Sequence, residues 1–580
     1  MENKIAAVLI QSLLERIERD RSIGSVSSLE RDALLQALEA LGSQAAGAPG
    51  TFSASPATPA VVEQADVSGI EVQAPASLPL ATAAAPSLPA VEMVLTAIER
   101  DTPTDPGVML CLDFGTAMSK AFASIEPNIH LELELGAAAG RMGHTLPSSV
   151  FIGDNGKVFF GFEAIELSQD LIESGRERLD SIKGWLSLRR EGDLNGESCV
   201  LSKSLNPTNF KLTQGDLIRI YLAYLTDMAG IAMMNCSHKS KKIQRYVRRR
   251  FARPCWPDQA QAKWADALMR SMMAEAQILA DTFSGRWEGG IDVGELKAAV
   301  EQLKSLSKKP DYLIAEGVPE PVAVAAGAFE DMENLRDAFM VVDVGAGTTD
   351  FGLFVSTRRL GEDEVRVFQV PASIQGLMQA GDKVDGMLRV YIAQKESIDT
   401  ADNAGRMNMA DLGRRIRGLK EALFKAGRLE YALADGTVGQ VSLDEFLADE
   451  RVGRFGSAVE AGFIKALQAL DESWLRWLSA QGVRLRVVLT GGSSELPMMK
   501  ALAKGSITVN GFEIQREEVS PRPQWVEDSS EELQAVYPQL AVAIGGSAEH
   551  MPQTLTAPPA FGGGTTQSKY VTGRMQVTGA

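Results

Sequence analysis

Two stretches of the chain share one pattern of apolar and polar positions. An apolar run over residues 108–112 ends in Asp113, and another over residues 339–342 ends in Asp343. Each Asp is followed by a short segment rich in Gly and Thr, and then by a second apolar run. The pattern predicts two β-hairpins, each with a carboxylate at the end of a buried strand. A charge in that position is costly unless something pairs with it.

The segments after the two aspartates bring backbone N–H groups and hydroxyls to one point. Such a turn can hold phosphate oxygens, with Mg²⁺ between phosphate and carboxylate. Gly345-Ala-Gly347 begins like a dinucleotide-binding fingerprint, but that fingerprint has to open a helix, and its third Gly position is Asp350 here. No G-x-x-x-x-G-K-[ST] sequence occurs, which excludes a P-loop.

A third apolar run, over residues 485–489, ends in Thr490 and is followed by Gly491-Gly492-Ser493. A helix is expected to begin at Pro497. Two consecutive glycines allow a flat base or a ribose to approach the backbone closely. The third stretch is therefore a candidate contact for a nucleoside.

The remaining pattern predicts four segments. Residues 1–43 have apolar positions at helical spacing and a capping box from Ser27 to Glu30, which predicts a helical interaction module too small to be stable alone. It has to pack on itself in a homodimer, on a protein partner, or on the main body. Residues 44–106 are predicted to be a disordered Ala/Pro-rich linker, 107–550 a globular domain of alternating strands and helices, and 551–580 a disordered tail.

Composition narrows the choice of function and location. The formal net charge of −17 argues against generic binding to nucleic acid. The four Cys have no C-x-x-C spacing and are predicted to be reduced thiols, and the four scattered His make a His-based metal site improbable. The acidic N-terminal region does not have the pattern of a signal peptide, and no membrane span is expected. A cytoplasmic protein is predicted.

In order and spacing, the three motifs resemble the phosphate-1, phosphate-2 and adenosine motifs of the actin, heat-shock protein 70 and hexokinase ATPase superfamily. Further segments resemble the nucleotide-binding domain of heat-shock protein 70-like chaperones, at residues 145–152, 178–186, 314–327, 379–385, 412–427 and 536–546. The resemblance implies an α/β fold, namely a two-lobed, actin-like ATPase domain related to ribonuclease H, with ATP and Mg²⁺ between the lobes.

Site residues follow from this resemblance. Mg²⁺ would be held through waters oriented by Asp113 and Asp343, while Glu320 or Asp350 would position the attacking water. The implied catalytic residues are Asp113, Lys183, Glu320, Asp343, Thr348 and Asp350. The implied nucleotide contacts are Gly115, Thr116, Gly345, Gly347, Gly381, Lys420, Gly491, Gly492 and Ser493.

The chain also departs from the family pattern. Where the chaperones have an adenine-stacking Arg, this chain has Glu495, and Arg417 replaces a Glu, so the two reversed charges suggest a salt bridge at the rim of the base pocket. The stretch 283–309 looks like an insertion. The basic stretch 239–253 is interpreted as an exposed or edge strand with solvated Arg side chains or, alternatively, as a patch for an anionic partner.

The expected function is a heat-shock protein 70-like switch that binds and slowly hydrolyses ATP, is bacterial in type, and lacks a peptide-binding domain after the ATPase. It would signal to a protein partner through the N-terminal helices or a lobe surface; neither nucleic acid nor a membrane is expected as a partner. A filament-forming actin-like protein and a small-molecule kinase of the sugar-kinase type stay open as alternatives.

Overall fold

The structure is a computed structural model that describes residues 86–125, 129–169, 176–188, 194–238, 241–256, 258–328, 336–358 and 365–559. The chain divides into two units, Met1–Thr82 and Ala83–Ala580, and the described residues all belong to the second. The predicted helical module, the linker up to residue 85 and the tail from residue 560 lie outside the described residues. The second unit is mixed α/β.

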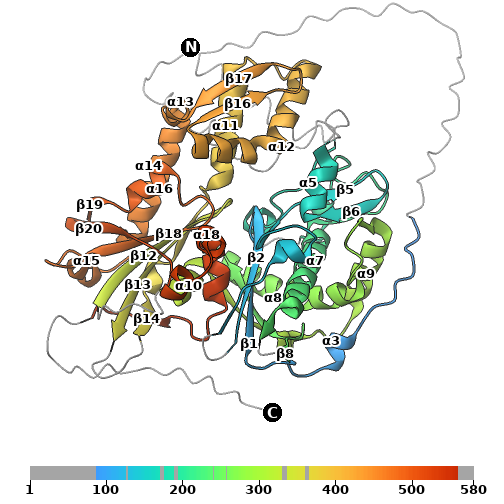
Figure 1. The fold of residues 1–580 in the computed structure, drawn as a ribbon, viewed down its shortest axis with the longest axis horizontal. Helices are drawn as coiled ribbons and strands as arrows, with labels where there is room; N and C mark the ends of the chain where they lie inside the picture. The colour runs from blue at the N-terminus through green and yellow to red at the C-terminus, as the bar shows by residue number, and fades with distance from the viewer. Residues whose placement is uncertain are drawn as a thin grey trace, which may run out of the picture. The chain divides into compact units, whose positions relative to one another are not determined.

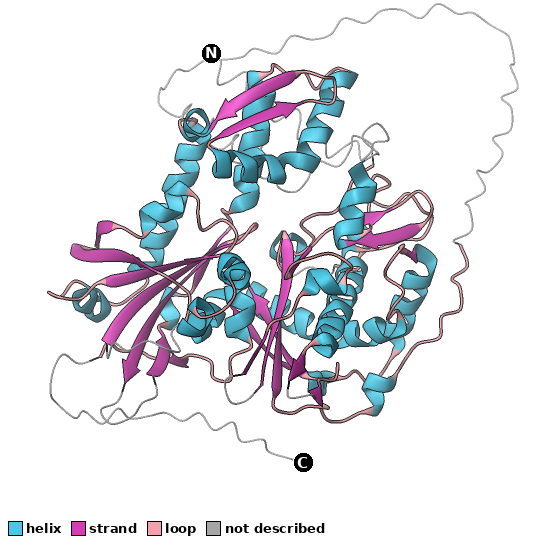
Figure 2. Cartoon of the chain, viewed as in Figure 1, coloured by secondary structure: helices cyan, strands magenta, loops and turns pink. Residues whose placement is uncertain are grey.

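A six-stranded mixed sheet forms the centre of the N-terminal half (Figures 1 and 2). β1 pairs with β2 as an antiparallel hairpin and with β9 in parallel, and β9 pairs with β11 in parallel. The apolar run of β1 is almost fully buried, as expected for a strand in the middle of a covered sheet. The strands are β1 (Val108–Asp113), β2 (Met118–Ile125), β3 (Ile129–Leu131), β4 (Thr145–Pro147), β9 (Arg248–Arg253) and β11 (Ile314–Pro319).

Long helices and a small second sheet pack around these strands. α7 (Gln214–Asn235) and α8 (Gln259–Thr282) lie against each other, and both begin at side-chain caps, Thr213 and Asp258. The small sheet has the order β10-β6-β5. The other elements here are α3 (Thr96–Glu99), α4 (Leu135–Ala138), β5 (Val150–Ile152), β6 (Lys157–Phe160), α5 (Gly161–Gln169), α6 (Gly184–Leu188), the 3₁₀ turns Glu197–Cys199 and Asp311–Leu313, β7 (Ser237–His238), β8 (Lys241–Lys242), β10 (Ile291–Asp292) and α9 (Val293–Ser305).

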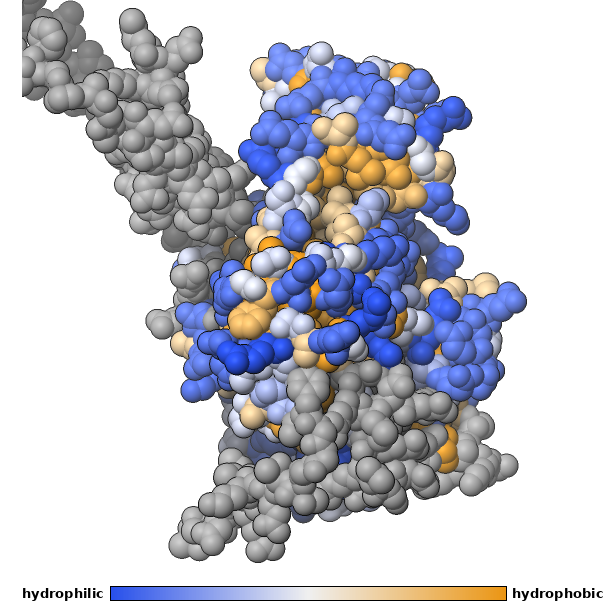
Figure 3. Space-filling model, turned by 90° about the vertical axis from the view of Figure 1, so that its left-hand side faces the viewer, coloured by the Kyte–Doolittle hydropathy of each residue, from blue (hydrophilic) through white to orange (hydrophobic). Residues whose placement is uncertain are grey.

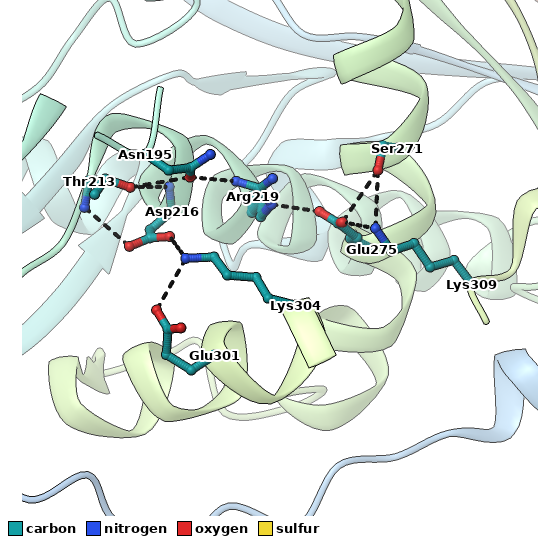
Figure 4. A network of polar contacts seen from close by, with 9 residues as sticks. All are labelled: Asn195, Thr213, Asp216, Arg219, Ser271, Glu275, Glu301, Lys304 and Lys309. Carbon is teal, nitrogen blue, oxygen red and sulfur yellow. Dashed lines mark hydrogen bonds and ion pairs between the residues drawn. The ribbon is translucent and has the colours of Figure 1, made fainter. Parts of the chain in front are cut away.

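Buried ion pairs join α7 to α8 and α9 (Figure 4). Asp216, fully buried on α7, accepts hydrogen bonds from Lys297 at 2.9 Å and Lys304 at 2.8 Å, both on α9. Burial alone would raise the pKa of Asp216, but the hydrogen bonds from the two lysines outweigh it and hold this pKa below its usual value. Arg219, one turn further along α7, pairs with Glu275 of α8 at 2.6 Å.

An eight-stranded mixed sheet forms the centre of the C-terminal half. Its arrangement repeats that of the first sheet, since β12 pairs with β13 as an antiparallel hairpin and with β18 in parallel. The strands are β12 (Arg336–Val344), β13 (Thr349–Arg358), β14 (Val365–Gln369), β15 (Gln375–Leu377), β18 (Leu485–Thr490), β19 (Gly505–Val509), β20 (Phe512–Val519) and β21 (Gln553–Thr554).

The segment between β15 and β18 is helical except for one hairpin. α11 and α12 pack on each other, and α12 ends at Gly427, which adopts a left-handed conformation with φ 71°. The 3₁₀ turn Pro371–Ser373 precedes β15. The elements after β15 are α11 (Gly381–Lys395), α12 (Asn403–Ala426), β16 (Arg428–Ala432), β17 (Val438–Ser442), α13 (Leu443–Leu447), α14 (Glu450–Gln468) and α15 (Glu472–Leu478); α16 (Pro497–Leu502) and α17 (Gln524–Glu527) follow β18 and β20.

Two crossing helices, α10 (Glu320–Ala328) and α18 (Glu531–Gly546), connect the halves (Figure 1). A Cβ on Gly545 would lie 1.8 Å from the carbonyl oxygen of Ala323, so the helix backbones touch where only glycine fits. Side chains of both helices share one core with Phe122 of β2 and Phe339 of β12. This third core lies between the cores of the two halves and positions the two hairpins.

The structure corrects two predicted boundaries. Residues 86–106 are mostly exposed, but a few of them attach this part of the predicted linker to the fold. Ala97 is fully buried and its carbonyl accepts from Tyr312 at 3.0 Å, while the Thr104 hydroxyl donates to the carbonyl of Tyr246. Within the predicted tail, β21 pairs with β14. Both segments are poor in periodic apolar positions, because each contributes only a few residues to a core built elsewhere.

The basic stretch is also corrected. β9 lies between β1 and β11 in the six-stranded sheet, so it is not an edge strand, and Arg249 and Arg250 are buried rather than solvated. Arg250 donates to Glu316 at 2.7 Å and to the carbonyl of Gly546 at 3.3 Å. Burial lowers the pKa of Arg249 to about 10. Arg250 is therefore paired inside the fold and Arg249 is buried, whereas Arg248 of the same strand is exposed.

One described helix, α7, is long and apolar enough to cross a membrane, but 89% of its most apolar window is buried within the fold. It is therefore a core helix of the N-terminal half. Among the described residues, the exposed large hydrophobic side chains are spread from Leu88 to Val438. Figure 3 shows one face of the molecule, where hydrophilic residues predominate around a smaller hydrophobic area. All four cysteines are free, in agreement with the prediction of reduced thiols.

Replacing Asp216 by Asn should destabilise the N-terminal half. Breaking a buried pair leaves charge without a partner, and because Lys297 and Lys304 are partly exposed we expect a loss near the lower end of the usual range, about 3 kcal/mol, in urea denaturation at pH 7. Glu301→Gln is the matched control: Glu301 pairs with the same two lysines but is 42% exposed, so its loss should stay below about 1 kcal/mol.

The pH dependence of this difference has a fixed sign. Asp216 has a lowered pKa in the folded state, so its contribution is complete above the unfolded pKa and disappears as pH falls through the folded value. The difference in the free energy of unfolding between the Asp216→Asn variant and the unsubstituted chain should therefore become smaller at acid pH. Equal losses for Asp216→Asn and Glu301→Gln at pH 7 would contradict a structural role for the buried pair.

Two truncated chains should show whether the linker ends before residue 86, as the structure indicates, or at residue 106, as the sequence predicted. A chain beginning at residue 86 should melt like the full chain. A chain beginning at residue 107 loses the packing of Ala97 and the hydrogen bonds of Val91 and Thr104, and its midpoint should fall by roughly 5 °C. Calorimetry measures both. Identical midpoints for the two truncations would restore the original linker boundary.

Candidate nucleotide site

The turns of the two hairpins face each other across a cavity of about 150 Å³. Gly115 and Thr116 connect β1 to β2, and residues 345–348 connect β12 to β13. A Cβ on Gly347 would lie 2.8 Å from the hydroxyl oxygen of Thr116, so the turns approach each other at a point that excludes a side chain. The continuation of both turns into strands confirms the predicted hairpins.

Two further segments meet these turns. Gly491 has φ 87°, and its N–H donates to the carbonyl of Pro538 at 2.7 Å, while the N–H of Ser493 donates to Val344 at 3.0 Å. Gly381 was expected in a turn but begins α11; its N–H donates to the carbonyl of Gly345 at 3.2 Å. A Cβ there would lie 2.6 Å from the Ser493 hydroxyl oxygen, which explains why this position is glycine.

Most of the predicted site residues therefore line one cavity. Asp350 and Gly381 are the predicted residues that do not line it: Asp350 is fully buried, and Gly381 lies behind Gly345. The predicted residues in the lining are Asp113, Gly115, Thr116, Lys183, Glu320, Asp343, Gly345, Gly347, Thr348, Lys420, Gly491, Gly492 and Ser493.

Buried carboxylates dominate the electrostatics of the cavity. Glu320, the first residue of α10, accepts from Lys183 at 2.7 Å, and both side chains are more than nine-tenths buried. Burial would lower the pKa of Lys183, but the charges of Glu320 and Asp113 outweigh it and raise that pKa. Lys183 is thus held as a cation on the cavity wall.

The second hairpin carries two more carboxylates. Burial, reinforced by the charge of Glu320, raises the pKa of Asp343 to about 7, although the Thr490 hydroxyl donates to it at 2.8 Å. The same two causes raise the pKa of Asp350 well above its usual range, although the N–H of Cys255 donates to this carboxylate at 2.6 Å. These raised pKa values show that the hydrogen bonds from Thr490 and Cys255 do not offset the cost of burying the two charges.

A hydrated divalent cation fits this set of donors. Among the described residues, no group of three or more His, Cys, Asp or Glu side chains is placed to bind a metal directly. Mg²⁺ keeps several of its waters and needs only one or two carboxylates, so Asp113 and Asp343 would suffice to hold it. A positive charge here would also offset the repulsion that raises the pKa of Asp343.

Lys120 is the main residue that sequence reasoning missed. It lines the cavity and donates to Asp113 at 3.0 Å. The signal was present in the hairpin, because antiparallel pairing of β1 with β2 places Lys120 directly opposite Asp113. The other lining residues outside the prediction are Ala117, Met118, Ala346, Arg417, Glu421, Gln539 and Val542.

The suggested salt bridge between Glu495 and Arg417 is wrong. Glu495 is 78% exposed and pairs with Lys500 at 2.9 Å, while Arg417 lies near Asp382 at 3.5 Å. Lys420, which the resemblance placed at the nucleoside, pairs with Asp385 at 2.8 Å. Both suggested partners already have an opposite charge beside them, on α16 and α11, so reversed signs at distant positions do not imply a pair.

Replacing Asp343 by Asn should change how the stability of the ligand-free protein depends on pH. The folded state keeps a proton on Asp343 up to about pH 7, whereas the unfolded chain releases it near 3.8, so stability falls as pH rises between these values. Each such proton corresponds to about 1.4 kcal/mol per pH unit. In the Asp343→Asn variant, the amide oxygen can still accept from Thr490.

Asp343→Asn should therefore be more stable than the unsubstituted chain at pH 8, and the two should converge near pH 4. Urea denaturation at both pH values measures this. Asp444→Asn, at an exposed position on α13, is the control and should change neither value. A lower stability of Asp343→Asn at pH 8 would show that the carboxylate is already neutralised by the protein.

Comparison with known proteins gives no family assignment. No family model matches the chain, and no curated protein matches it significantly. Function therefore has to be inferred from the geometry of the cavity.

Proposed function

We propose that the chain is a switch protein that binds ATP with Mg²⁺ and hydrolyses it slowly, on a two-lobed fold of the actin and heat-shock protein 70 type. The observation that carries this proposal is the meeting of two Asp-Gly-Thr hairpins, from two sheets of the same topology, at one cavity. Each sheet would form the centre of one lobe. The mixed α/β fold and the crossing of α10 with α18 between the sheets are compatible with this arrangement.

The backbone supplies the phosphate contacts. The turns at Gly115–Thr116 and 345–348 present N–H groups and hydroxyls to the cavity without intervening side chains. Lys120 and Lys183 add two cations at the same wall, which favours an anionic group between the turns. Gly491, Gly492 and Lys420 line the same cavity and would contact the nucleoside.

The carboxylates would have two roles, holding the metal and positioning the attacking water. Mg²⁺ would be held through waters by Asp113 and Asp343, and would supply charge neutralisation for the phosphates. Glu320 lines the cavity and can accept a proton or a hydrogen bond from an attacking water, while Asp350 lies behind it, fully buried. Lys183 donates to Glu320 in the ligand-free arrangement and can donate to a phosphate oxygen instead. Positioning and charge stabilisation of this kind suffice for slow phosphoryl transfer.

The output of such a site would be a change in the angle between the lobes, a hinge motion controlled by the nucleotide. The crossing of α10 and α18 links the cavity to this motion, because Glu320 begins α10 and the carbonyl of Pro538 in α18 holds Gly491. A protein partner would recognise the change in the angle between the lobes. Bacterial type and cytoplasmic location belong to the same proposal.

The test is phosphate release by the full chain with Mg-ATP and no added acceptor. Asp343→Ala should lower the rate by about 100-fold, the usual effect of removing one preorganised electrostatic group. Asp444→Ala, at an exposed position on α13, should leave the rate unchanged. Release that requires an added small molecule would favour a kinase, nucleotide-dependent pelleting would favour a filament, and an unchanged rate in Asp343→Ala would remove the assignment of this site.

A further inference from the structure

A second cavity, of about 340 Å³, lies in the N-terminal half and shares no lining residue with the nucleotide cavity. Its volume is at the lower end of the range for small-molecule sites, roughly 300–1,000 Å³. Four segments form its walls: the end of α4 and the turn after it, β6 with α5, the second half of α7, and the loop after α8. The lining residues are Ala138, Ala139, Gly140, Arg141, Phe160, Phe162, Glu163, Glu166, Tyr224, Met228, Ile231, Gly285, Trp287 and Glu288.

The inner wall is a preformed aromatic cluster. Phe160 stacks on Tyr224 with ring centroids 5.2 Å apart, and Trp287 meets both rings edge-on at 5.3 and 5.6 Å. The indole N–H of Trp287 donates to buried Asp227 at 2.9 Å, which fixes the ring. Mutual packing of this kind keeps the wall in place without a ligand and offers an apolar surface to one.

The Tyr224 hydroxyl in this wall has no hydrogen-bond partner among the described residues. Tyr224 is only 5% exposed, yet its hydroxyl makes no hydrogen bond with any described residue. Its neighbour on α7, Tyr221, donates to Ser119 at 3.0 Å, as buried tyrosines usually do. Gly161 leaves room beside the Tyr224 hydroxyl, since a Cβ there would lie 2.9 Å from the oxygen. The aromatic wall thus offers one hydroxyl able to bond a ligand.

The rim of the cavity is acidic. It carries three glutamates and one arginine, a net charge of −2. Arg141 is already paired with Glu166, and Glu163 accepts from the N–H of Gly289 at 3.1 Å. Glu288 is exposed and makes no ion pair with a described residue. This field attracts a cation and repels an anion, the opposite preference to that of the phosphate turns.

We propose that this cavity binds a small organic cation with an aromatic or apolar body. The body would contact Phe160 and Trp287, the Tyr224 hydroxyl would bond a polar atom of the ligand, and the ammonium group would lie at the rim beside Glu288. Gly285, Trp287 and Glu288 belong to the stretch that looks like an insertion relative to the family resembled. The site shares no lining residue with the nucleotide cavity, so it does not depend on the proposed ATPase activity.

The test compares two probes of nearly equal size and opposite charge, 2-phenylethylamine and 3-phenylpropionate. Calorimetry with the full chain at pH 7.5 should show one site for the amine, with the carboxylate at least about 10-fold weaker. Raising the salt concentration should weaken the binding of the amine, because the rim charges are exposed to solvent and are screened by salt. No binding of either probe, or equal binding of both, would overturn the proposal.

Three variants locate the site. Tyr224→Phe removes only the hydroxyl and should lower the affinity for the amine about 3- to 10-fold, the usual effect of losing one hydrogen bond. Glu288→Gln should weaken it by a similar factor and reduce its salt dependence. Glu460→Gln, at an exposed position on α14, is the charge-matched control and should have no effect. An unchanged affinity in both Tyr224→Phe and Glu288→Gln would place the amine elsewhere and refute the assignment.

Discussion

The burial of negative charge at the ends of central strands is the constraint on which the site depends. Asp113 and Asp343 end strands that lie in the middle of covered sheets, and Glu320 and Asp350 are buried close to them. Lys120 and Lys183 are the lysines that pair with this group. Carboxylates that exceed their partners are destabilising, so stability alone does not explain the arrangement; a bound cation, as proposed for this site, would.

Glycines allow these charged groups to converge. At Gly347, Gly381 and Gly491 a side chain would collide with another segment of the site, so the backbones themselves form its walls. A glycine also allows close backbone contact where α10 crosses α18, at Gly545. Close backbone contact therefore shapes both the cavity and the connection between the two halves.

Local patterns in the sequence were sufficient for the hairpins and for most of the cavity lining. The runs ending in Asp113, Asp343 and Thr490 form the predicted strands, and the Gly-rich segments after them line one cavity. These predictions succeed because strand, turn and buried charge are all encoded within a dozen residues. The two-lobed architecture and the nucleotide stay predictions.

Failures arose where the outcome depended on distant partners. Arg249 and Arg250 lie in an internal strand. Arg249 donates to Gln277, and Arg250 donates to Glu316 and to the carbonyl of Ala548; none of these partners is near in sequence. Glu495 is held by Lys500 in preference to Arg417. Lys120 was missed for a different reason: its role appears only when the register of the hairpin is written out.

That register also distinguishes the two hairpins, which are otherwise alike. The residue opposite Asp113 is Lys120, whereas the residue opposite Asp343, at the equivalent position, is Asp350. The first hairpin therefore neutralises its own carboxylate, whereas the second places two carboxyl groups opposite each other, and burial together with the charge of Glu320 raises the pKa of both. Under the proposed function, the first hairpin would favour the anionic phosphates and the second the cation and the water. The two hairpins thus share one topology but differ in charge, because the residue opposite the strand-end Asp differs between them.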